Sequence, residues 1–134
     1  MRKSLWVVAV LVIVLSLTLA ACGNTGAGGT DPAATAVESY LKAVVAKESA
    51  KVSTLSCKAW EQQALLEMDG FQAVKAELDK VSCKNSGTDG AATLVACTGN
   101  INLTYNTEKQ SLDVSRQTYK VIQEGGDWRV CGYK

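Results

Sequence analysis

The order of sequence patterns predicts an α+β domain over residues 31–134, with helices packed on one face of an antiparallel sheet. Apolar residues first recur at helical spacing, and after Cys83 the composition changes to Thr, Val, Tyr and Asn punctuated by Gly. Helices followed by a run of strands are typical of this fold class. Two disulfides are also expected, because the same segment holds four cysteines: Cys57, Cys83, Cys97 and Cys131.

The first 21 residues are typical of an export signal. Arg2 and Lys3 precede an uncharged apolar run, LWVVAVLVIVLSLTL. At about 15 residues, this run is nearer to a signal-peptide core than to the roughly 20 residues of a membrane-spanning helix. It leads into Leu19-Ala20-Ala21-Cys22, which resembles the lipobox of bacterial lipoproteins at every position. The resemblance implies cleavage before Cys22 and attachment of a diacylglyceryl group to its thiol.

An uncleaved anchor helix and an ordinary secretory signal ending at Ala21 are the alternatives for this segment. In the lipoprotein interpretation, Cys22 anchors the protein to the extracytoplasmic face of a cell membrane, because two or three lipid chains give stable attachment. Residues 22–30 follow as a Gly-rich flexible tether. After loss of residues 1–21, 12 basic and 13 acidic residues remain, a net charge of −1. This balance argues against a nucleic-acid partner.

Asp31 and Pro32 predict the start of the first helix, as its N-cap and its first helical residue. The apolar stripe of this helix follows at i, i+3, i+4, i+7 and i+8: Val37, Tyr40, Leu41, Val44 and Val45. The segment from Ser49 to Ser82 is also predicted to be helical, with breaks near Cys57 and at Gly70. Val52 and Leu55 indicate a short turn that ends near Cys57. A second helix follows with Trp60, Ala64 and Met68, and a third with Phe71, Val74 and Leu78.

Three strands are predicted after Cys83. Residues 91–105 form the first, with a bulge or bend at Gly99. Residues 106–110 form a polar connection, and residues 112–124 and 127–133 are joined by the hairpin turn Gly125-Gly126. If Gln123 pairs with Trp128, then Val121 pairs with Val130, and the side chains divide between two faces. One face has Tyr119, Val121, Trp128 and Val130, and the other has Ile122, Cys131 and Tyr133.

Three pairings of the four domain cysteines are possible. Cys83 with Cys97 is favoured, because the turn residues 87–90 lie between them and antiparallel strands would bring the two positions opposite each other. Cys57 is then left to pair with Cys131, which requires Cys131 to be reachable from the helical layer. A zinc site is disfavoured, since no two of these cysteines have the spacing of about two to four residues that such sites use.

The element order and the terminal hairpin, Tyr119-Lys120-Val121 with Asp127-Trp128-Arg129-Val130-Cys131-Gly132-Tyr133, resemble the cystatin-like fold called nuclear transport factor 2-like. More narrowly, they resemble small bacterial lipoproteins that carry such a domain. The resemblance covers residues 31–134 and implies that the sheet is curved into a cone around the helices. It rests on element order rather than on a chemical motif.

The chain contains no histidine, which removes the commonest general base and the usual catalytic zinc ligand. Enzymes of the resembled fold such as ketosteroid isomerase use a carboxylate base with acidic hydrogen-bond donors. Such a role is conceivable for Tyr40, Tyr105 and Tyr119 with Glu38, Glu108 or Asp113, but their spacing selects none of them, and half-buried tyrosines with solvated acids are the plainer interpretation. No catalytic residue, metal ligand or cofactor is therefore assigned.

A ligand pocket between the helices and the sheet is a further hypothesis. Its candidate lining residues are Tyr40, Trp60, Phe71, Tyr119 and Trp128, which could equally form plain core. Asn102-Leu103-Thr104 matches a glycosylation sequon, which beside a bacterial lipobox is taken as a chance match.

Three functions are consistent with these features. The first is a non-enzymatic, lipid-anchored binding or interaction domain of the cell envelope, whose partner is an envelope protein or a small apolar ligand. The second is a small metal-free enzyme of the isomerase or dehydratase kind, and the third is a passive structural lipoprotein. Fold alone does not choose among them.

Overall fold

The computed structural model describes residues 30–134, which form an α+β domain of three helices on a five-stranded antiparallel sheet. The predicted signal segment, the lipobox with Cys22 and nearly all of the tether lie outside the described residues. The helices and one 3-10 turn are α2 (Pro32–Val45), α3 (Ser49–Leu55), α4 (Glu61–Asp69) and η1 (Val114–Arg116). The strands are β1 (Lys75–Asp89), β2 (Ala92–Tyr105), β3 (Glu108–Asp113), β4 (Thr118–Glu124) and β5 (Asp127–Tyr133).

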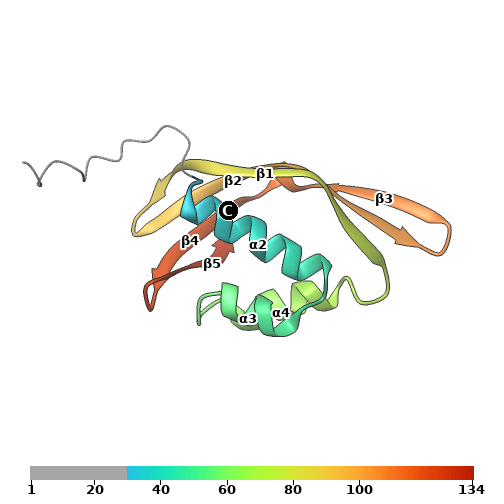
Figure 1. Ribbon diagram of the computed structural model, residues 1–134, viewed down its shortest axis with the longest axis horizontal. Helices are drawn as coiled ribbons and strands as arrows, with labels where there is room; N and C mark the ends of the chain where they lie inside the picture. The colour runs from blue at the N-terminus through green and yellow to red at the C-terminus, as the bar shows by residue number, and fades with distance from the viewer. Residues whose placement is uncertain (1–29) are drawn as a thin grey trace, which may run out of the picture.

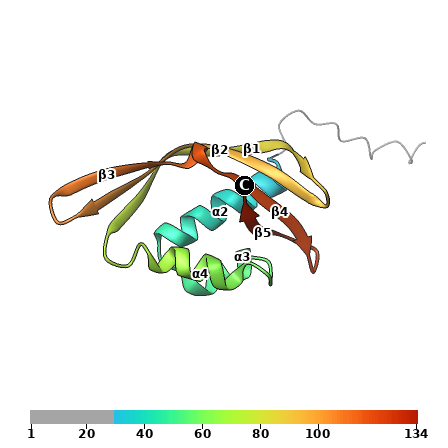
Figure 2. The same cartoon turned by 180° about the vertical axis from the view of Figure 1, so that it is seen from behind.

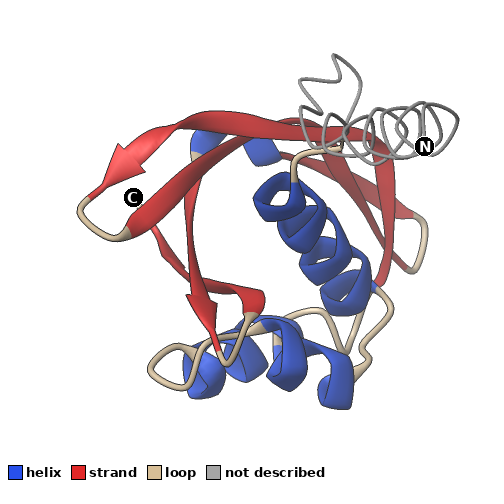
Figure 3. Ribbon diagram, turned by 60° about the vertical axis from the view of Figure 1, so that its left-hand side comes forward, coloured by secondary structure: helices blue, strands red, loops and turns tan. Residues whose placement is uncertain are grey.

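The sheet bends over helix α2. Its strand order is β1-β2-β4-β5, with β3 paired to the other half of β2. Strands β1 and β2 arch over α2, while α3 and α4 lie against the opposite side of that helix (Figures 1 and 2). Helix α2 therefore lies inside the curve of the sheet (Figure 3). No helix within residues 30–134 has the length and apolar character needed to cross a membrane.

Helix α2 begins as predicted. The Asp31 carboxylate accepts a hydrogen bond from the backbone N–H of Ala33 at 2.9 Å, and Pro32 opens the helix. This side chain satisfies a backbone donor that has no partner within the helix. The buried face of α2 consists of Ala33, Ala34, Ala36, Val37, Tyr40, Leu41, Ala43 and Val44. The predicted apolar stripe thus forms the centre of the core, with Val45 at its edge.

Replacing Leu41 with alanine is expected to lower the free energy of unfolding by about 2–5 kcal/mol, because Leu41 is 3% exposed and its removal leaves a cavity under the sheet. Lys42→Ala, at the exposed position that follows, is the matched control and should change stability by no more than about 0.5 kcal/mol. Urea unfolding of both variants measures the difference. Similar small effects at the two positions would contradict this packing.

The segment after Gly70 is a strand, and the predicted third helix is wrong. Residues 71–73 form a turn, and β1 begins at Lys75. The sequence KAELDK consists largely of good helix formers, but its pairing with β2 overrides that local preference. Burial alternates as in a strand: Ala76 and Leu78 are partly buried, while Lys75 and Glu77 are exposed.

A bulge in the first strand pair lies opposite Gly99, where a bend was predicted. The register of β1 and β2 shifts between Asp79 and Ser82, and Lys80 has a φ of 52°. Gly99 itself has a φ of 103°, and a Cβ at this position would lie 2.5 Å from the Lys80 carbonyl oxygen. Only glycine allows such a close approach of the two backbones.

The predicted connection 106–110 and the predicted strand 112–124 both need correction. Asn106, with a φ of 53°, and Thr107 make a tight turn, so that β3 starts at Glu108. The long strand is interrupted after β3 because the Asp113 carboxylate accepts a hydrogen bond from the Ser115 backbone N–H at 2.8 Å and starts η1. The interruption lets β3 and β4 pair with different halves of β2. The β2–β3 hairpin consequently projects beyond the helices (Figure 1).

The last hairpin has the predicted register at its turn. Gln123 pairs with Trp128 and Val121 with Val130, and Gly125 and Gly126 both have the positive φ of a type I′ turn. The expectation that Tyr133 lies on the face opposite Tyr119 is wrong. A register shift between Tyr119 and Val121 pairs Tyr119 with Tyr133 and brings both rings to one face.

Both disulfide pairs have the favoured connectivity. Cys83 and Cys97 are direct cross-strand partners of β1 and β2, with Cα atoms 4.0 Å apart. Cys57 and Cys131, 5.1 Å apart at Cα, are joined because the segment after α3 runs beside the edge of β5. In that segment, the Cys57 N–H donates to the Val130 carbonyl at 2.8 Å. Cys131 is therefore reached from the sheet edge, not through a sheet face.

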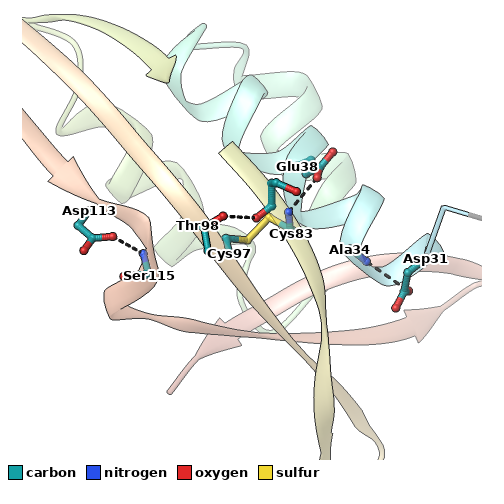
Figure 4. The surroundings of a disulfide bond; sticks show 9 residues. Asp31, Ala34, Glu38, Cys83, Cys97, Thr98, Asp113 and Ser115 are labelled. Carbon is teal, nitrogen blue, oxygen red and sulfur yellow. Dashed lines mark hydrogen bonds between the residues drawn. A yellow bond between two sulfur atoms is a disulfide. The ribbon is translucent and has the colours of Figure 1, made fainter. Parts of the chain in front are cut away.

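Glu38 links helix α2 to the first of these disulfides. Its carboxylate accepts a hydrogen bond from the Cys83 backbone N–H at 2.9 Å (Figure 4). The contact positions β1 over the helix, and the Glu38 carboxylate therefore has a structural role.

Candidate functional site

A cavity of about 560 Å³ lies between the helices and the concave side of the sheet. Its wall combines the buried face of α2, the end of α4, the end of β3 with η1, and the facing residues of β4 and β5. The lining residues are Tyr40, Leu41, Val44, Glu67, Phe71, Ile101, Gln110, Ser111, Leu112, Asp113, Val114, Arg116, Gln117, Tyr119 and Tyr133. A volume of this size is typical of a small-molecule site.

One carboxylate in this wall accepts hydrogen bonds from two tyrosines. The Tyr40 hydroxyl donates to Glu67 Oε2 at 3.1 Å, and the Tyr133 hydroxyl donates to Glu67 Oε1 at 2.8 Å. The three residues come from α2, α4 and β5, so the arrangement depends on the packing of the helices against the last strand. Hydrogen bonds to an ionised acceptor are stronger than those between neutral groups.

Aromatic rings pack against Tyr133, whose hydroxyl donates to the carboxylate. The Tyr133 ring packs edge-on against Trp60, with centroids 5.3 Å apart, and against Tyr119 at 6.3 Å. Such edge-to-face pairs contribute about 0.5–1.5 kcal/mol each beyond their buried area. Trp60 also covers Gly132, and its indole N–H has no hydrogen-bond partner among the described residues. These contacts orient Tyr133, one of the two tyrosines that hold Glu67.

The tyrosines of the cavity wall remain protonated well above neutral pH. Burial, followed by the negative charge of Glu67, raises the pKa of Tyr119 to about 12 and that of Tyr40 further. The pKa of Tyr133 is also raised, chiefly because its hydroxyl donates to Glu67. A neutral hydroxyl is a hydrogen-bond donor, so these groups act as donors in the physiological range.

These raised pKa values predict a loss of stability in alkali. A tyrosine whose pKa rises on folding stabilises the native state fully below its unfolded pKa, and this contribution is lost as pH rises through the folded value. For Tyr119, the loss should occur between its ordinary pKa of 10.0 and about 12. Tyr119→Phe should reduce the loss, which urea unfolding at several pH values between these limits would measure. Identical pH profiles for this variant and the parent would contradict the prediction.

Three of the five predicted pocket residues line the cavity together: Tyr40, Phe71 and Tyr119. Trp60 lies behind the wall, packed on Gly132 and Tyr133. Trp128 is placed elsewhere, near the turn of the last hairpin opposite Gln123, where it packs against the core.

The residues considered for a catalytic role are mostly dispersed. Tyr105 is 54% exposed near the tip of the projecting hairpin, and Glu108 is exposed beside it. Glu38 is engaged with the Cys83 backbone, as described above. Asp113 lies at the cavity wall but caps η1. Of this set, only Tyr40 and Tyr119 lie near the Glu67 carboxylate.

Glu67 and Tyr133 are the site residues that the sequence analysis did not select. Glu67 lies three residues after Ala64 and precedes Met68, both buried, so its position borders the packed face of α4. This helical spacing was the sequence signal that could have placed Glu67 at the border of the core. Tyr133 was assigned to the wrong face because the register shift in β4–β5 has no clear signature in sequence.

The described residues contain no group of three or more His, Cys, Asp or Glu side chains that could hold a metal ion. The polar groups available in the cavity wall are the carboxylates of Glu67 and Asp113, the Arg116 guanidinium and the phenolic donors, beside the aromatic rings. This combination can bind a polar or charged group within apolar surroundings, and it can transfer a proton to or from Glu67.

Comparison with known proteins adds evidence for the fold. No protein-family model matches the chain, and no curated protein matches it either. Among solved structures, the chain is similar to the solution structure of a SEC-C motif containing protein from Rhodopseudomonas palustris. The similarity covers 78% of this chain and 80% of that chain, with a TM-score of 0.50 and 10% sequence identity. At this identity, the likeness concerns the fold alone.

Proposed function

We propose that this protein is a lipid-anchored ligand-binding protein of the cell envelope, whose domain takes up a small molecule in the cavity between α2, α4 and the sheet. The observation that carries the proposal is the Glu67 carboxylate, held by Tyr40 and Tyr133 in a cavity of about 560 Å³. A few convergent polar groups in a mostly apolar cavity are the usual features of a small-molecule site.

The proposal includes the nuclear transport factor 2-like, cystatin-like cone as the fold type. The curvature of the sheet around α2, and the position of the cavity inside that curve, support this assignment.

Membrane attachment through Cys22 is the second part of the proposal. Its support is the sequence: a basic start, an uncharged apolar run and the lipobox Leu19-Ala20-Ala21-Cys22. A Gly-rich tether would allow the domain to stand away from the membrane and sample its surroundings. The domain would then meet ligands outside the cytoplasm.

An isomerase- or dehydratase-like enzyme is the second candidate function, favoured by one observation. Glu67 lies beside two phenolic donors. In such an enzyme, a carboxylate acts as the general base, and nearby hydrogen-bond donors stabilise the negative charge that develops on the substrate. Binding is preferred, because both oxygens of Glu67 accept hydrogen bonds that hold the carboxylate in place. Turnover of a bound carbonyl compound that is lost in Glu67→Gln would favour the enzyme.

Photolabelling tests whether the cavity binds ligands. The full-length chain in vesicles would be exposed to small uncharged diazirine fragments, and the labelled residues would be mapped by mass spectrometry. We expect label to concentrate on the cavity wall, at Phe71, Leu112 and Tyr119. Leu112→Trp, at the exposed part of this wall, should reduce the labelling, whereas Lys109→Trp on the same strand should not.

Unselective labelling would contradict ligand binding. In that case, the label would be spread over the surface in proportion to exposure and would be unchanged in Leu112→Trp. This result would favour a passive structural lipoprotein, the third function consistent with the sequence.

A further inference from the structure

The Glu67 carboxylate has no cationic partner within residues 30–134. All the ion pairs of this part of the chain involve other acids: Glu48, Glu61, Glu77, Asp89 and Asp127. Two neutral phenols hydrogen-bond to Glu67, but they do not neutralise its charge. A carboxylate in partly apolar surroundings is better stabilised when a positive charge lies close to it.

The other charged groups of the cavity wall do not provide that compensation. Asp113 and Arg116 both line the cavity, on exposed positions at η1, and their charges are opposite. The three charged lining residues therefore give a net charge of −1. Within residues 30–134, Glu67 takes part in no ion pair. Its field contributes to the raised pKa values of Tyr40 and Tyr119.

The rings near Glu67 suit an organic cation better than a hydrated metal ion. Tyr40, Phe71, Tyr119 and Tyr133 all line the same cavity as the carboxylate. The face of an aromatic ring attracts a cation such as an alkylated ammonium group, and the attraction increases when water is excluded. Aromatic rings are the usual recognition groups for quaternary ammonium ligands, whereas Ca²⁺ and Mg²⁺ require several oxygen ligands.

We propose that the cavity selects small ligands that carry an organic cation, an alkylammonium or quaternary ammonium group, which lies against Glu67 with the rest of the ligand on the apolar wall. This inference rests on the proposed ligand-binding function and names the chemical class of its ligand. Glu67 supplies the opposite charge and the tyrosine and phenylalanine rings supply the cation–π surface. The apolar remainder of the ligand contacts Leu41, Val44 and Ile101.

A pair of isosteric probes tests the charge requirement directly. Choline and 3,3-dimethylbutan-1-ol have the same shape, but only choline carries the positive charge. Ligand-observed NMR titration of the full-length chain in an uncharged maltoside detergent would measure both. We expect choline to bind at least about tenfold more tightly, as an added charge contact of moderate strength would give.

The matched variants are Glu67→Gln and Asp69→Asn, both on α4. Glutamine keeps an oxygen acceptor for one tyrosine hydroxyl, offers an N–H donor to the oxygen of the other, and removes the charge. Asp69 is exposed and does not line the cavity. The tenfold preference for choline should disappear in Glu67→Gln and remain in Asp69→Asn.

The outcomes distinguish this inference from the proposed function. Equal binding of the two probes, or a choline preference that survives Glu67→Gln, overturns the cation inference while photolabelling of the cavity still supports ligand binding. If neither probe binds, the cation inference is also overturned, and the photolabelling result then tests the proposed function separately. If Glu67→Gln does not fold, the difference in affinity of the parent chain for the two probes still tests the cation inference.

Discussion

Replacing Cys22 with serine is expected to abolish lipid attachment completely and to leave the precursor uncleaved. In the lipoprotein interpretation, the Cys22 thiol is the atom that receives the diacylglyceryl group, and cleavage follows that modification. Serine has nearly the same size but lacks the sulfur nucleophile. Metabolic labelling with a radioactive fatty acid should therefore mark the parent chain and leave the variant unlabelled, with the variant migrating at the precursor mass.

A substitution nearby provides the control for this prediction. Asn24→Ser changes the tether two residues after Cys22 and should leave labelling and processing unchanged. Because the other four cysteines are paired in disulfides, they should accept no label. Normal fatty-acid labelling of Cys22→Ser would contradict the lipoprotein interpretation and favour an uncleaved anchor or an ordinary secretory signal.

The elements that sequence predicted well are those with a local physical signal. The first helix has an N-cap at Asp31, a proline at its first position and apolar residues on one face, and all three act in the structure as expected. The turn at Gly125-Gly126 is equally local, since both positions require positive φ. Each of these features is specified within about a dozen residues.

The errors occur where tertiary contacts outweigh local preference. Residues 75–80 have a helix-forming composition, yet they form a strand because β2 supplies a partner along the whole of β1. The interruption at η1 depends on one hydrogen bond to Asp113. Tyr133 lies on the same face as Tyr119 because of one register shift between β4 and β5. None of these effects can be recognised from periodicity alone.

The candidate site was predicted only in part for the same reason. Tyr40, Phe71 and Tyr119 were selected as large aromatic residues that lie between helices and sheet, and all three line the cavity. Glu67 was missed because its spacing from Ala64 and Met68 places it only at the border of the packed face of α4 and does not indicate which groups it meets. Its significance comes from the two tyrosines that meet it, and one of these, Tyr133, reaches it only through the irregular hairpin.

The second large effect is expected from removal of the Cys57–Cys131 disulfide. The double variant Cys57→Ala/Cys131→Ala should lose about 4.5 kcal/mol of unfolding free energy, according to the loop-entropy estimate for a separation of 74 residues. This bond closes a loop that contains α4 and almost all of the sheet. It also anchors the segment after α3 to the edge of β5, where Cys57 is fully buried.

The other disulfide provides the matched comparison. Cys83→Ala/Cys97→Ala opens a loop of only 14 residues within one strand pair, for which the same estimate is about 3 kcal/mol. Urea unfolding of both double variants would measure the difference, and alanine avoids free thiols that could form new bonds. The long bridge also holds Tyr133, two residues after Cys131, near Glu67, so its loss should weaken ligand binding in the cavity as well as stability. An equal or larger destabilisation by the short bridge would show that the α3–β5 attachment is maintained by packing without the covalent bond.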